Sequence, residues 1–424
     1  MAKKEPKIRF KGFEGEWEER TLGSMGETYN GLSGKTKSDF GHGEAQFVTY
    51  MNVFSNPVAS PDGIDHVEID SSQNEVKKGD ILFTTSSETP DEVGMSSVWM
   101  EDTPNTYLNS FCFGYRPNAP IDPYFAAYLM RSPKIRNDFY FLAQGISRFN
   151  ISKQKAMDIE ITIPKGDEQQ KIGEFFQQLD ELIGAKEQEL EKLRQMKQAL
   201  LDKMFPSDEE IAPPIRFKGF TKRWLKIRLR DMFDFSLPHY SHSRDQLNNS
   251  EGDVQNVHYG DILIRYGEVI HAESDNIPFI MSERSDNYKN AKLQDGDILF
   301  ADTAEDETCG KAVEITKIGG RTIIAGLHTF VARPKKEFGS KYLGYFFNSN
   351  AFHNQLLPLM QGTKVLSVSK PSVEGTFIFF PLDIQEQRLI GNFFHSQDEA
   401  INSSKEEIAK LRTLKHACLQ QMFA

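Results

Sequence analysis

Two acidic residues and a lysine near the amino terminus have a spacing that metal chemistry could use. Asp62 is followed by Glu75 and Lys77, in the order of a loose motif found in metal-dependent nucleases. In such a site two carboxylates hold Mg²⁺ and the lysine assists the reaction. The motif is so permissive that chance matches are common, and Asp62 lies in a Pro-Asp-Gly turn with no equivalent later in the chain. A stand-alone metal-dependent nuclease is therefore kept as an alternative and not as the leading hypothesis.

Other catalytic motifs are missing from the sequence. It has no Gly-x4-Gly-Lys-Ser/Thr phosphate loop, no Gly-x-Gly-x-x-Gly after a strand, and no Asn/Asp-Pro-Pro-aromatic tetrapeptide of the amino-methyltransferase kind. The closest histidine pair, His239 and His242, has no third ligand nearby, although zinc needs three or four. Asp80 and Asp297 are expected to be turn residues that precede strands. The sequence thus predicts a chain with neither a catalytic nor a metal site.

The most informative feature of the sequence is that it repeats itself once. Ile-Arg-Phe-Lys-Gly-Phe at 8–13 returns at 215–220, and Gly-Asp-Ile-Leu-Phe at 79–83 returns at 296–300. Further pairs follow in the same order: Gln144-Gly145 with Gln361-Gly362, Ser152-Lys153 with Ser369-Lys370, and Lys192-Leu193-Arg194 with Lys410-Leu411-Arg412. A period of roughly 210 residues is too long for a solenoid and indicates two copies of a whole domain. Between the matched blocks the copies differ, as in 27–75 against 234–292.

The composition is that of an ordinary globular protein. Its 424 residues are 38% hydrophobic and 26% charged, which is enough for two domains with cores of their own. The sequence shows neither an apolar run of about 18 residues nor a secretion signal, and its three lone cysteines suit a reducing compartment. We therefore expect a cytoplasmic protein with no membrane partner. The net charge of −11 counts mildly against nucleic-acid binding, although local charge decides binding.

Each copy is predicted to be a mixed α/β domain. Strand patterns lie at 47–53, 80–84 and 158–164 in the first copy and at 376–380 in the second. Helical patterns lie at 124–144, with a break near Pro133, and at 341–357. These patterns predict one domain at 1–165 and a second at 215–383.

A long helix is predicted after each domain, at 166–205 and at 384–424, with a linker at 206–214. Apolar residues recur there in alternating steps of four and three, which is a heptad seam. The seam residues are Phe176, Leu179, Ile183, Leu190, Leu193 and Leu200 in the first helix and Phe394, Ile401, Ile408 and Leu411 in the second. Lys197 and Lys415 occupy matching polar seam positions, which can fix the register. We expect the two helices to pair in antiparallel fashion, although a plain dimerisation or packing device also fits the heptads.

The ordered set of blocks resembles the specificity subunit of type I restriction–modification systems. The resemblance rests on the Ile-Arg-Phe-x-Gly-Phe…Trp opening, the Gly-Asp-Ile-Leu-Phe strand and the Gln-Gly…Ser-Lys stretch. It also rests on the segments that begin the long helices, with Glu168-Gln169 and Glu386-Gln387, and on the Lys-Leu-Arg-x-x-Lys pattern. No single block is specific. All of them together, in order and in both copies, cover essentially the full chain.

The resemblance implies a non-catalytic DNA-binding subunit of α+β fold. Two target-recognition domains would each read one half of an asymmetric bipartite site in double-stranded DNA, and the helices would form an antiparallel spacer with pseudo-two-fold symmetry. Two methyltransferase (modification) subunits would dock on the helices and methylate adenine with S-adenosylmethionine, and a restriction or translocase subunit using ATP and magnesium can join them. No cofactor is expected in this chain. A purely structural coiled-coil protein is the other alternative, and it would show no salt-sensitive DNA binding.

Polar residues near the repeated blocks are the predicted DNA contacts. Arginine and asparagine can read guanine and adenine in the major groove, whereas serine, threonine and lysine hold phosphates. The candidates of the first domain are Thr84, Thr85, Ser86, Ser87, Arg148, Asn150, Ser152, Lys153 and Lys155. Those of the second are Arg265, Tyr266, Thr303, Lys311, Lys364, Ser367, Ser369 and Lys370. The two sets differ residue by residue, because Arg148 matches Val365 and Thr85 matches Asp302.

Overall fold

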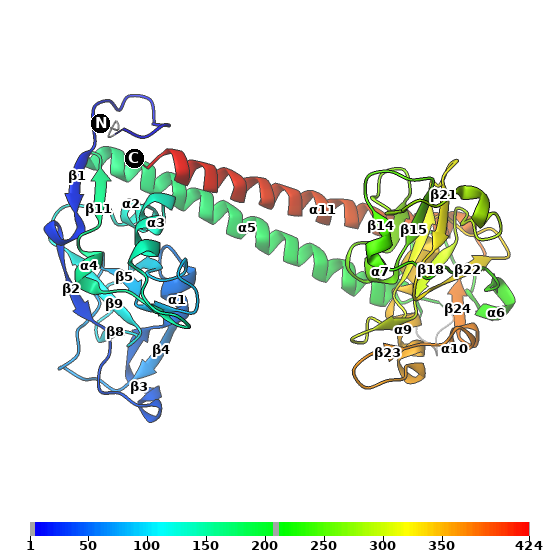
Figure 1. Cartoon of the computed structure of the whole chain (residues 1–424). Helices are drawn as coiled ribbons and strands as arrows, with labels where there is room; N and C mark the ends of the chain where they lie inside the picture. Colours follow the sequence, from blue (N-terminus) through cyan, green and yellow to red (C-terminus); the bar gives the residue numbers. More distant parts are fainter. Residues whose placement is uncertain (1–4, 207–211, 424) are drawn as a thin grey trace. The chain divides into compact units, whose positions relative to one another are not determined.

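The computed structural model describes residues 5–206 and 212–423, and the chain divides into two compact units (Figure 1). Unit 1 comprises residues 1–187 and 406–424, and unit 2 comprises residues 188–405. The borders between the units fall inside the two long helices, whereas the predicted domain borders lay at the helix ends. Part of the predicted linker, 207–211, lies outside the described residues. In the described ranges no helix is long and apolar enough to cross a membrane.

Unit 1 contains two small sheets and several short helices. The first sheet has the order β2 (Gly26–Asn30), β9 (Cys112–Pro117), β5 (Ile81–Thr84) and β7 (Ser96–Val98), with antiparallel neighbours. The second has the order β4 (Ile64–Val67), β3 (Phe40–Val48) and β8 (Thr106–Leu108), in which β3 and β8 are parallel. Two further pairs are β1 (Glu18–Thr21) with β11 (Glu160–Ile163) and β6 (Ser86–Ser87) with β10 (Phe149–Asn150). The helices are α1 (Tyr50–Ser55), α2 (Pro123–Leu129), α3 (Pro133–Leu142) and α4 (Lys153–Ala156), with 3-10 turns η1 (Leu22–Ser24) and η2 (Lys37–Asp39).

Unit 2 has a related plan with one larger sheet. The sheet order is β13 (Phe233–Asp234), β22 (Thr329–Pro334), β18 (Ile298–Ala301), β20 (Ala312–Thr316) and β16 (Val269–His271). A second sheet has the order β14 (Leu247–Asn248), β17 (Phe279–Ile280), β15 (Val254–Val257) and β21 (Thr322–Ala325). Two-stranded pairs are β12 (Leu225–Arg228) with β24 (Phe377–Phe380) and β19 (Thr303–Ala304) with β23 (Leu366–Ser367). The helices are α6 (Leu229–Met232), α7 (Tyr259–Ile264), α8 (Tyr342–Phe347), α9 (Asn350–Leu356) and α10 (Lys370–Glu374), with η3 (Arg244–Gln246), η4 (Ser285–Tyr288) and η5 (Leu357–Leu359).

The repeated Ile-Leu-Phe strands form the centre of each core. Strands β5 and β18 are buried along their whole length, as expected of short apolar runs covered on both faces. Phe83 stacks on Phe113 in unit 1, and Phe300 stacks on Phe330 in unit 2, each pair with ring centroids 5.1 Å apart. The repeated sequence therefore builds the same core twice.

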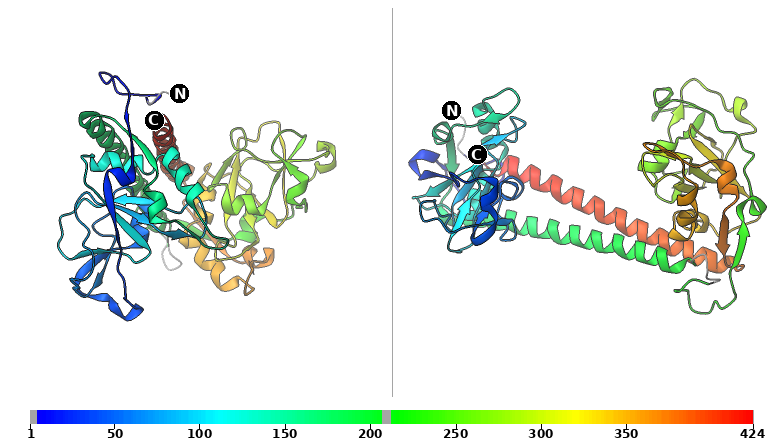
Figure 2. Two further views of the ribbon diagram at one scale, coloured as in Figure 1. Left: turned by 60° about the vertical axis from the view of Figure 1, so that its left-hand side comes forward. Right: turned by 90° about the horizontal axis from the view of Figure 1, so that it is seen from below.

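Each unit also contains one segment of each long helix, α5 (Gly166–Met204) and α11 (Ile384–Gln421). Within a unit the two segments run side by side (Figure 1, Figure 2). In unit 1, Asp180 of α5 lies 2.5 Å from Lys415 of α11, and Lys186 lies 3.1 Å from Glu407. Because higher numbers in α5 meet lower numbers in α11, the segments are antiparallel, as predicted.

The predicted break at Pro133 is confirmed. Helix α2 ends at Leu129, and α3 begins with Pro133 at its first position, where a missing N–H costs nothing. Helix α2 begins in the same way with Pro123, and the carboxylate of Asp122 accepts a 2.8 Å hydrogen bond from the N–H of Phe125.

Two predicted elements were wrong in part. The strand predicted at 47–53 stops at Val48, because Thr49 caps α1 by accepting a hydrogen bond from the N–H of Asn52. The helix predicted at 341–357 is two helices, because the backbone of Ser349 is extended between α8 and α9. In both places one polar residue changes the backbone conformation inside an otherwise continuous apolar pattern.

Candidate nucleic-acid interface

An ion pair joins the amino-terminal motif of each copy to the start of the long helix that follows. Arg9 lies 2.7 Å from the buried carboxylate of Glu168, and Arg216 lies 2.5 Å from that of Glu386. In each case the ion pair raises the pKa of the arginine, with the hydrogen bond to glutamate as the largest cause. The repeated Ile-Arg-Phe and Glu-Gln motifs are therefore in contact, and in each unit the ion pair links the amino-terminal segment to the long helix. We call this contact the Arg–Glu joint.

The repeated aspartates before the central strands form a second joint. The N–H of Lys77 donates to Asp80, and the N–H of Gln294 donates to Asp297, each over 2.8 Å. These bonds confirm the predicted turn role. Both carboxylates are buried and also pair at 2.6 Å with an arginine that the sequence did not suggest, Arg116 in unit 1 and Arg333 in unit 2.

The polar seam positions pair across the two helix segments. Lys415 meets Asp180 in unit 1, and Lys197 meets Asp398 in unit 2, each at 2.5 Å. A buried tyrosine donates to each aspartate, Tyr128 over 2.9 Å and Tyr345 over 2.7 Å. A lysine on one helix that must find an aspartate on the other fixes their register, as a polar coiled-coil position does.

Most of the predicted apolar seam is buried. The buried members are Phe176, Leu179, Ile183, Leu190, Phe394, Ile401 and Ile408, whereas Leu193, Leu200 and Leu411 are half-buried. At the end of α5 the buried residue is Leu201 and not Leu200. A straight helix has 3.6 residues per turn, so a strict heptad drifts off the buried face over several turns.

The repeated Met-Phe pairs anchor the helix ends. Phe423 stacks on Phe176 in unit 1, with centroids 5.7 Å apart, and Phe205 stacks on Phe394 in unit 2, with centroids 6.1 Å apart. Each unit thus takes into its core the terminal phenylalanine of the helix that ends there. These ion pairs, helix contacts and phenylalanine anchors involve repeated residues in both units, and we call them together the frame.

The Gln-Gly motif forms the same hairpin in both units. We call residues 144–150 the unit 1 loop and residues 361–367 the unit 2 loop. Their ends pair through backbone hydrogen bonds, Gln144 with Asn150 and Gln361 with Ser367, and each continues into a short strand. Gly145 and Gly362 have positive φ, and a Cβ there would lie about 2 Å from the carbonyl oxygen of Arg148 or Val365. Glycine is required at both positions, and the tips of both loops are exposed.

The predicted contacts of unit 1 separate into exposed and buried residues. The exposed ones are Arg148, Asn150, Ser152 and Lys155, on the loop and just after it. Lys153 is half-buried and donates to Asn30. Thr84, Ser86 and Ser87 are buried, and the half-buried Thr85 donates its hydroxyl to the carbonyl of Phe111 over 2.7 Å. The structure brings the exposed group together, and it gives the threonine–serine run structural contacts.

The predicted contacts of unit 2 separate in the same way. Lys364, Ser367 and Ser369 are exposed on or beside the loop. The others make internal contacts. Lys311 donates to the carbonyls of Leu263 and Tyr266, Lys370 to Phe235, Thr303 to Leu366 and Tyr266 to Asn276, and the exposed Arg265 pairs with buried Asp261. Among the basic candidates of unit 2, Lys364 is thus exposed on the loop, whereas Lys311, Lys370 and Arg265 are held by internal contacts.

Reasoning from the sequence missed the aromatic residues beside the unit 1 loop. Tyr50, Phe54 and Phe111 line a cavity of about 380 Å³ together with Arg148. The guanidinium of Arg148 lies over the ring of Phe111, 5.5 Å from its centroid. Aligning the two copies would have pointed to this place, because His328 stands where Phe111 stands.

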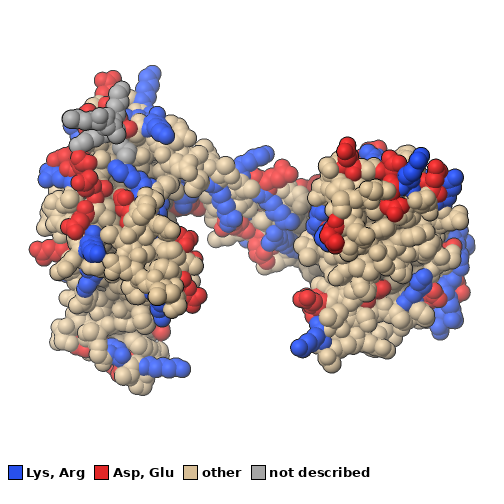
Figure 3. Space-filling view, viewed as in Figure 1, with Lys and Arg blue, Asp and Glu red and all other residues tan. Residues whose placement is uncertain are grey.

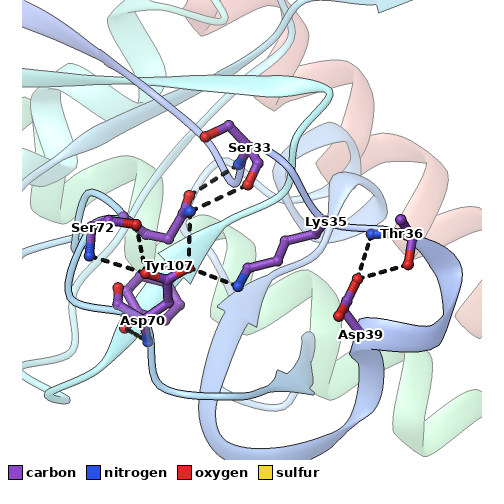
Figure 4. A network of polar contacts seen from close by, with 8 residues as sticks. Ser33, Lys35, Thr36, Asp39, Asp70, Ser72 and Tyr107 are labelled. Carbon is purple, nitrogen blue, oxygen red and sulfur yellow. Dashed lines mark hydrogen bonds and ion pairs between the residues drawn. The ribbon is translucent and has the colours of Figure 1, made fainter.

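The unrepeated segment of unit 1 is held by local polar contacts (Figure 4). Lys35 lies 2.7 Å from Asp70, whose backbone also exchanges hydrogen bonds with the hydroxyl of Tyr107. Lys35, with Ser72, holds the pKa of the Asp70 carboxyl well below its usual range. Thr36 and Asp39 form a capping box that shapes the same loop. This variable segment therefore has a defined conformation.

Charged residues of both signs are mixed on one face of the molecule. On the face drawn in Figure 3, lysine and arginine lie among aspartate and glutamate over both units, with wide uncharged areas between them. Among the described residues no group of three or more His, Cys, Asp or Glu could hold a metal ion, and Asp62, Glu75 and Lys77 are each exposed. Nothing in the structure supports the nuclease alternative.

Comparisons with known proteins agree with this frame. Residues 14–195 match the family model "Type I restriction modification DNA specificity domain". Among curated relatives from Methanocaldococcus jannaschii, the putative type I restriction enzyme MjaX specificity subunit is 28% identical over 200 residues, 45% of each chain. The type I restriction enzyme MjaVIII specificity subunit is 22% identical over 302 residues, 68% of this chain and 67% of the relative. The chain thus spans about half the length of the first relative and two thirds of the second.

Two solved structures have the same fold over nearly the whole chain. The S subunit of a type I restriction–modification system from M. genitalium has a TM-score of 0.57 at 14% identity and covers 99% of both chains. The second is a chain from a structure that concerns complex assembly and conformational transition of the type I R-M system. It has a TM-score of 0.58 at 16% identity, and the match covers 96% of this chain and 97% of that chain. The predicted α+β fold with two related domains and long helices is confirmed, and so is the family resemblance.

Proposed function

We propose that this chain, which carries a type I restriction–modification DNA specificity domain, is the DNA-recognition subunit of a type I restriction–modification complex. Unit 1 reads one half of a bipartite site in double-stranded DNA, and unit 2 reads the other. The observation that carries the proposal is that one frame is built twice, while the exposed loops on it differ. A protein that read the same sequence twice would have no need of different loops.

The proposed site is asymmetric because the loops differ in chemistry. The unit 1 loop carries Arg148 and Asn150, which can pair with base edges, whereas the unit 2 loop carries Lys364 and Ser367, which suit phosphates. The segments 27–75 and 234–292 differ as well. In this proposal the chain catalyses nothing itself.

Exposed apolar residues on the helices support docking of partner subunits. Met196 of α5 is 45% exposed and Leu414 of α11 is 50% exposed, and the two occupy matching positions of the repeat. Exposed apolar positions on a helix favour a protein partner. A matched pair favours two copies of one partner, here methyltransferase subunits that bring S-adenosylmethionine. ATP and magnesium would belong to a further restriction subunit.

The test is to express the chain with a type I methyltransferase subunit and to map modified adenines in the DNA of the cells. We expect methylation at one bipartite, asymmetric sequence. Exchange of residues 27–160 for the segment of another family member should change one half of that sequence and leave the other half intact. Methylation that is absent, or unchanged after the exchange, would contradict the proposal. Mg²⁺-dependent cleavage by the purified chain alone would instead favour the nuclease.

A further inference from the structure

One exposed arginine of unit 1 lies over an exposed aromatic ring. We infer that Arg148, whose guanidinium lies over the ring of Phe111, recognises a guanine in the half-site of unit 1, and that the equivalent place in unit 2 reads no guanine in this way. The inference rests on the proposed function and names the recognition residue within it. Neither the family match nor the relatives assign a role to either residue.

The backbone holds Arg148 in a fixed place. The Gln144–Asn150 bridge closes the loop, and Gly145 packs against the carbonyl of Arg148 so tightly that no side chain fits between them. The N–H of Ile151 donates to the carbonyl of Thr85 over 3.0 Å, which ties the end of the loop to the core strand. The arginine therefore projects from a rigid hairpin, and little backbone entropy is lost when it binds.

The backbone of Phe111, whose ring lies under the guanidinium, is also held by hydrogen bonds. The carbonyl of Phe111 accepts hydrogen bonds from the N–H and the hydroxyl of Thr85, over 2.9 and 2.7 Å, and its N–H donates to Asn109. The Phe111 side chain is nevertheless 53% exposed. The guanidinium is planar by its own delocalisation, and a cation–π contact with the ring leaves its N–H edge available to a ligand. Among the described residues, Arg148 has the ring as a contact but no hydrogen-bond or ion-pair partner.

The surroundings favour a base edge over a phosphate. The cavity beside Arg148 is lined by Tyr50, Met51 and Phe54 and also by two carboxylates, Glu88 and Glu92. Carboxylates repel a phosphate, whereas an uncharged base edge is not repelled. A carboxylate can also accept from the amino group of cytosine, which lies next to guanine O6 in the major groove. Arginine and glutamate in one cavity therefore match a G·C pair, in which arginine donates to guanine O6 and N7.

Unit 2 has the same backbone contacts with different side chains. The N–H of Asp302 donates to the carbonyl of His328 over 3.0 Å, as Thr85 does to Phe111. His328 lies 3.0 Å from the Asp302 carboxylate, and Val365 occupies the place of Arg148. The paired donors of an arginine are absent from this position. Arg148 and Val365 thus occupy the same position of the hairpin, where the backbone contacts are shared and the side chain differs.

The experiment uses the full chain with its methyltransferase subunits and DNA duplexes that carry the mapped site. Arg148→Gln should lower the preference for guanine at one position of the unit 1 half-site by about 10- to 100-fold, the range of one bidentate contact. Lys155→Gln, which removes an exposed charge from the same unit, should weaken binding to all sequences alike. Lys364→Gln should leave the unit 1 half-site unchanged.

A modified base provides a test that needs no variant. Replacing that guanine with 7-deazaguanine removes N7 and should weaken binding by the wild-type chain but not by Arg148→Gln. An unchanged guanine preference in Arg148→Gln, or an equal loss for all sequences, would overturn the inference. A wild-type chain that methylates no bipartite site would instead overturn the proposed function.

Discussion

Helix α2 of unit 1 and helix α8 of unit 2 have their first backbone N–H groups capped in different ways. In unit 1, Asp122 caps α2 from the position next to Pro123. In unit 2, Lys341 stands before α8 with a left-handed backbone, and no side chain of its own caps the helix. Glu314 of β20 accepts the N–H groups of Lys341 and Gly344 instead, over 2.6 and 3.0 Å. A local cap in one unit is replaced by a tertiary cap in the other.

The difference shows which residues a duplicated domain must keep. Where the surrounding contacts are the same in both units, the residue is the same, as for the Arg–Glu joint and for the glycines at Gly173 and Gly391. A Cβ at either glycine would lie within 2.7 Å of backbone atoms at the start of α2 or α8. Where the fold needs only an acceptor for the first N–H groups of a helix, the residue that supplies it and its place in the chain can change. The exposed loops can change most freely.

The largest expected effect tests whether the two frames are equivalent. Phe205→Ala and Phe423→Ala each remove a buried ring and should each lower the free energy of unfolding of the full chain by about 3–5 kcal/mol. Urea unfolding measures the loss, and hydrogen exchange shows whether it falls in unit 2 or in unit 1. Leu414→Ala, which truncates a half-exposed residue, serves as the control and should change stability by less than about 0.5 kcal/mol. A small effect of only one phenylalanine would show that the anchors are not equivalent.

A smaller effect on stability is expected from pH, and it should distinguish the cap of unit 2 from that of unit 1. Burial raises the pKa of Glu314 from 4.5 to about 7, so the folded state holds a proton that the unfolded state releases. Stability of unit 2 should therefore fall as pH rises from about 4.5 to about 7, by about 3 kcal/mol in total.

Glu314→Gln provides the reference for this titration. Glutamine offers one acceptor oxygen to the two N–H donors, so the variant should be less stable than the wild type near pH 4.5, and this deficit should shrink as the pH rises to about 7. Denaturant unfolding at several pH values measures the difference. Parallel pH profiles for the two chains would contradict the raised pKa of the buried Glu314 carboxyl. Unit 1 should show no matching titration, because Val98 stands at the equivalent strand position.

The smallest expected effect concerns the variable segment of unit 1. Lys35→Met breaks the contact with Asp70 and loosens the loop, and we expect it to weaken binding through the unit 1 half-site by up to about five-fold. Lys37→Met removes the same charge from an exposed position of the same loop and is the matched control. Binding to duplexes in which one half-site is altered at a time measures the change. Equal losses for both lysines would show that charge matters and conformation does not.

Much of the frame could be predicted from the sequence. The Gly-Asp turn before each central strand, the break at Pro133 and the paired helices all follow from local chemistry or from a periodic pattern. The repeat adds that whatever one copy forms the other forms too. The strand at 47–53 and the single helix at 341–357 could not be resolved correctly, since one capping or extended residue decided each outcome.

The candidate interface was less predictable. The polar residue type and the position in the repeat pointed to Arg148 and Lys364, which are exposed, and equally to Thr85 and Lys311, which donate to backbone carbonyls inside the protein. A polar residue looks alike in sequence whether it faces solvent or a buried carbonyl. Phe111 was missed because only polar residues near the repeated blocks were taken as candidate DNA contacts.

The sequence by itself determined the duplicated frame, because caps, turns, periodic apolar faces and matched blocks are written into neighbouring residues. Only the tertiary structure decided which partners the repeated charges find, such as Arg116 for Asp80 and Asp398 for Lys197. It also decided that Arg148 lies over an exposed ring. These contacts join residues far apart in the chain, and their energies depend on distance and burial, which no local pattern records.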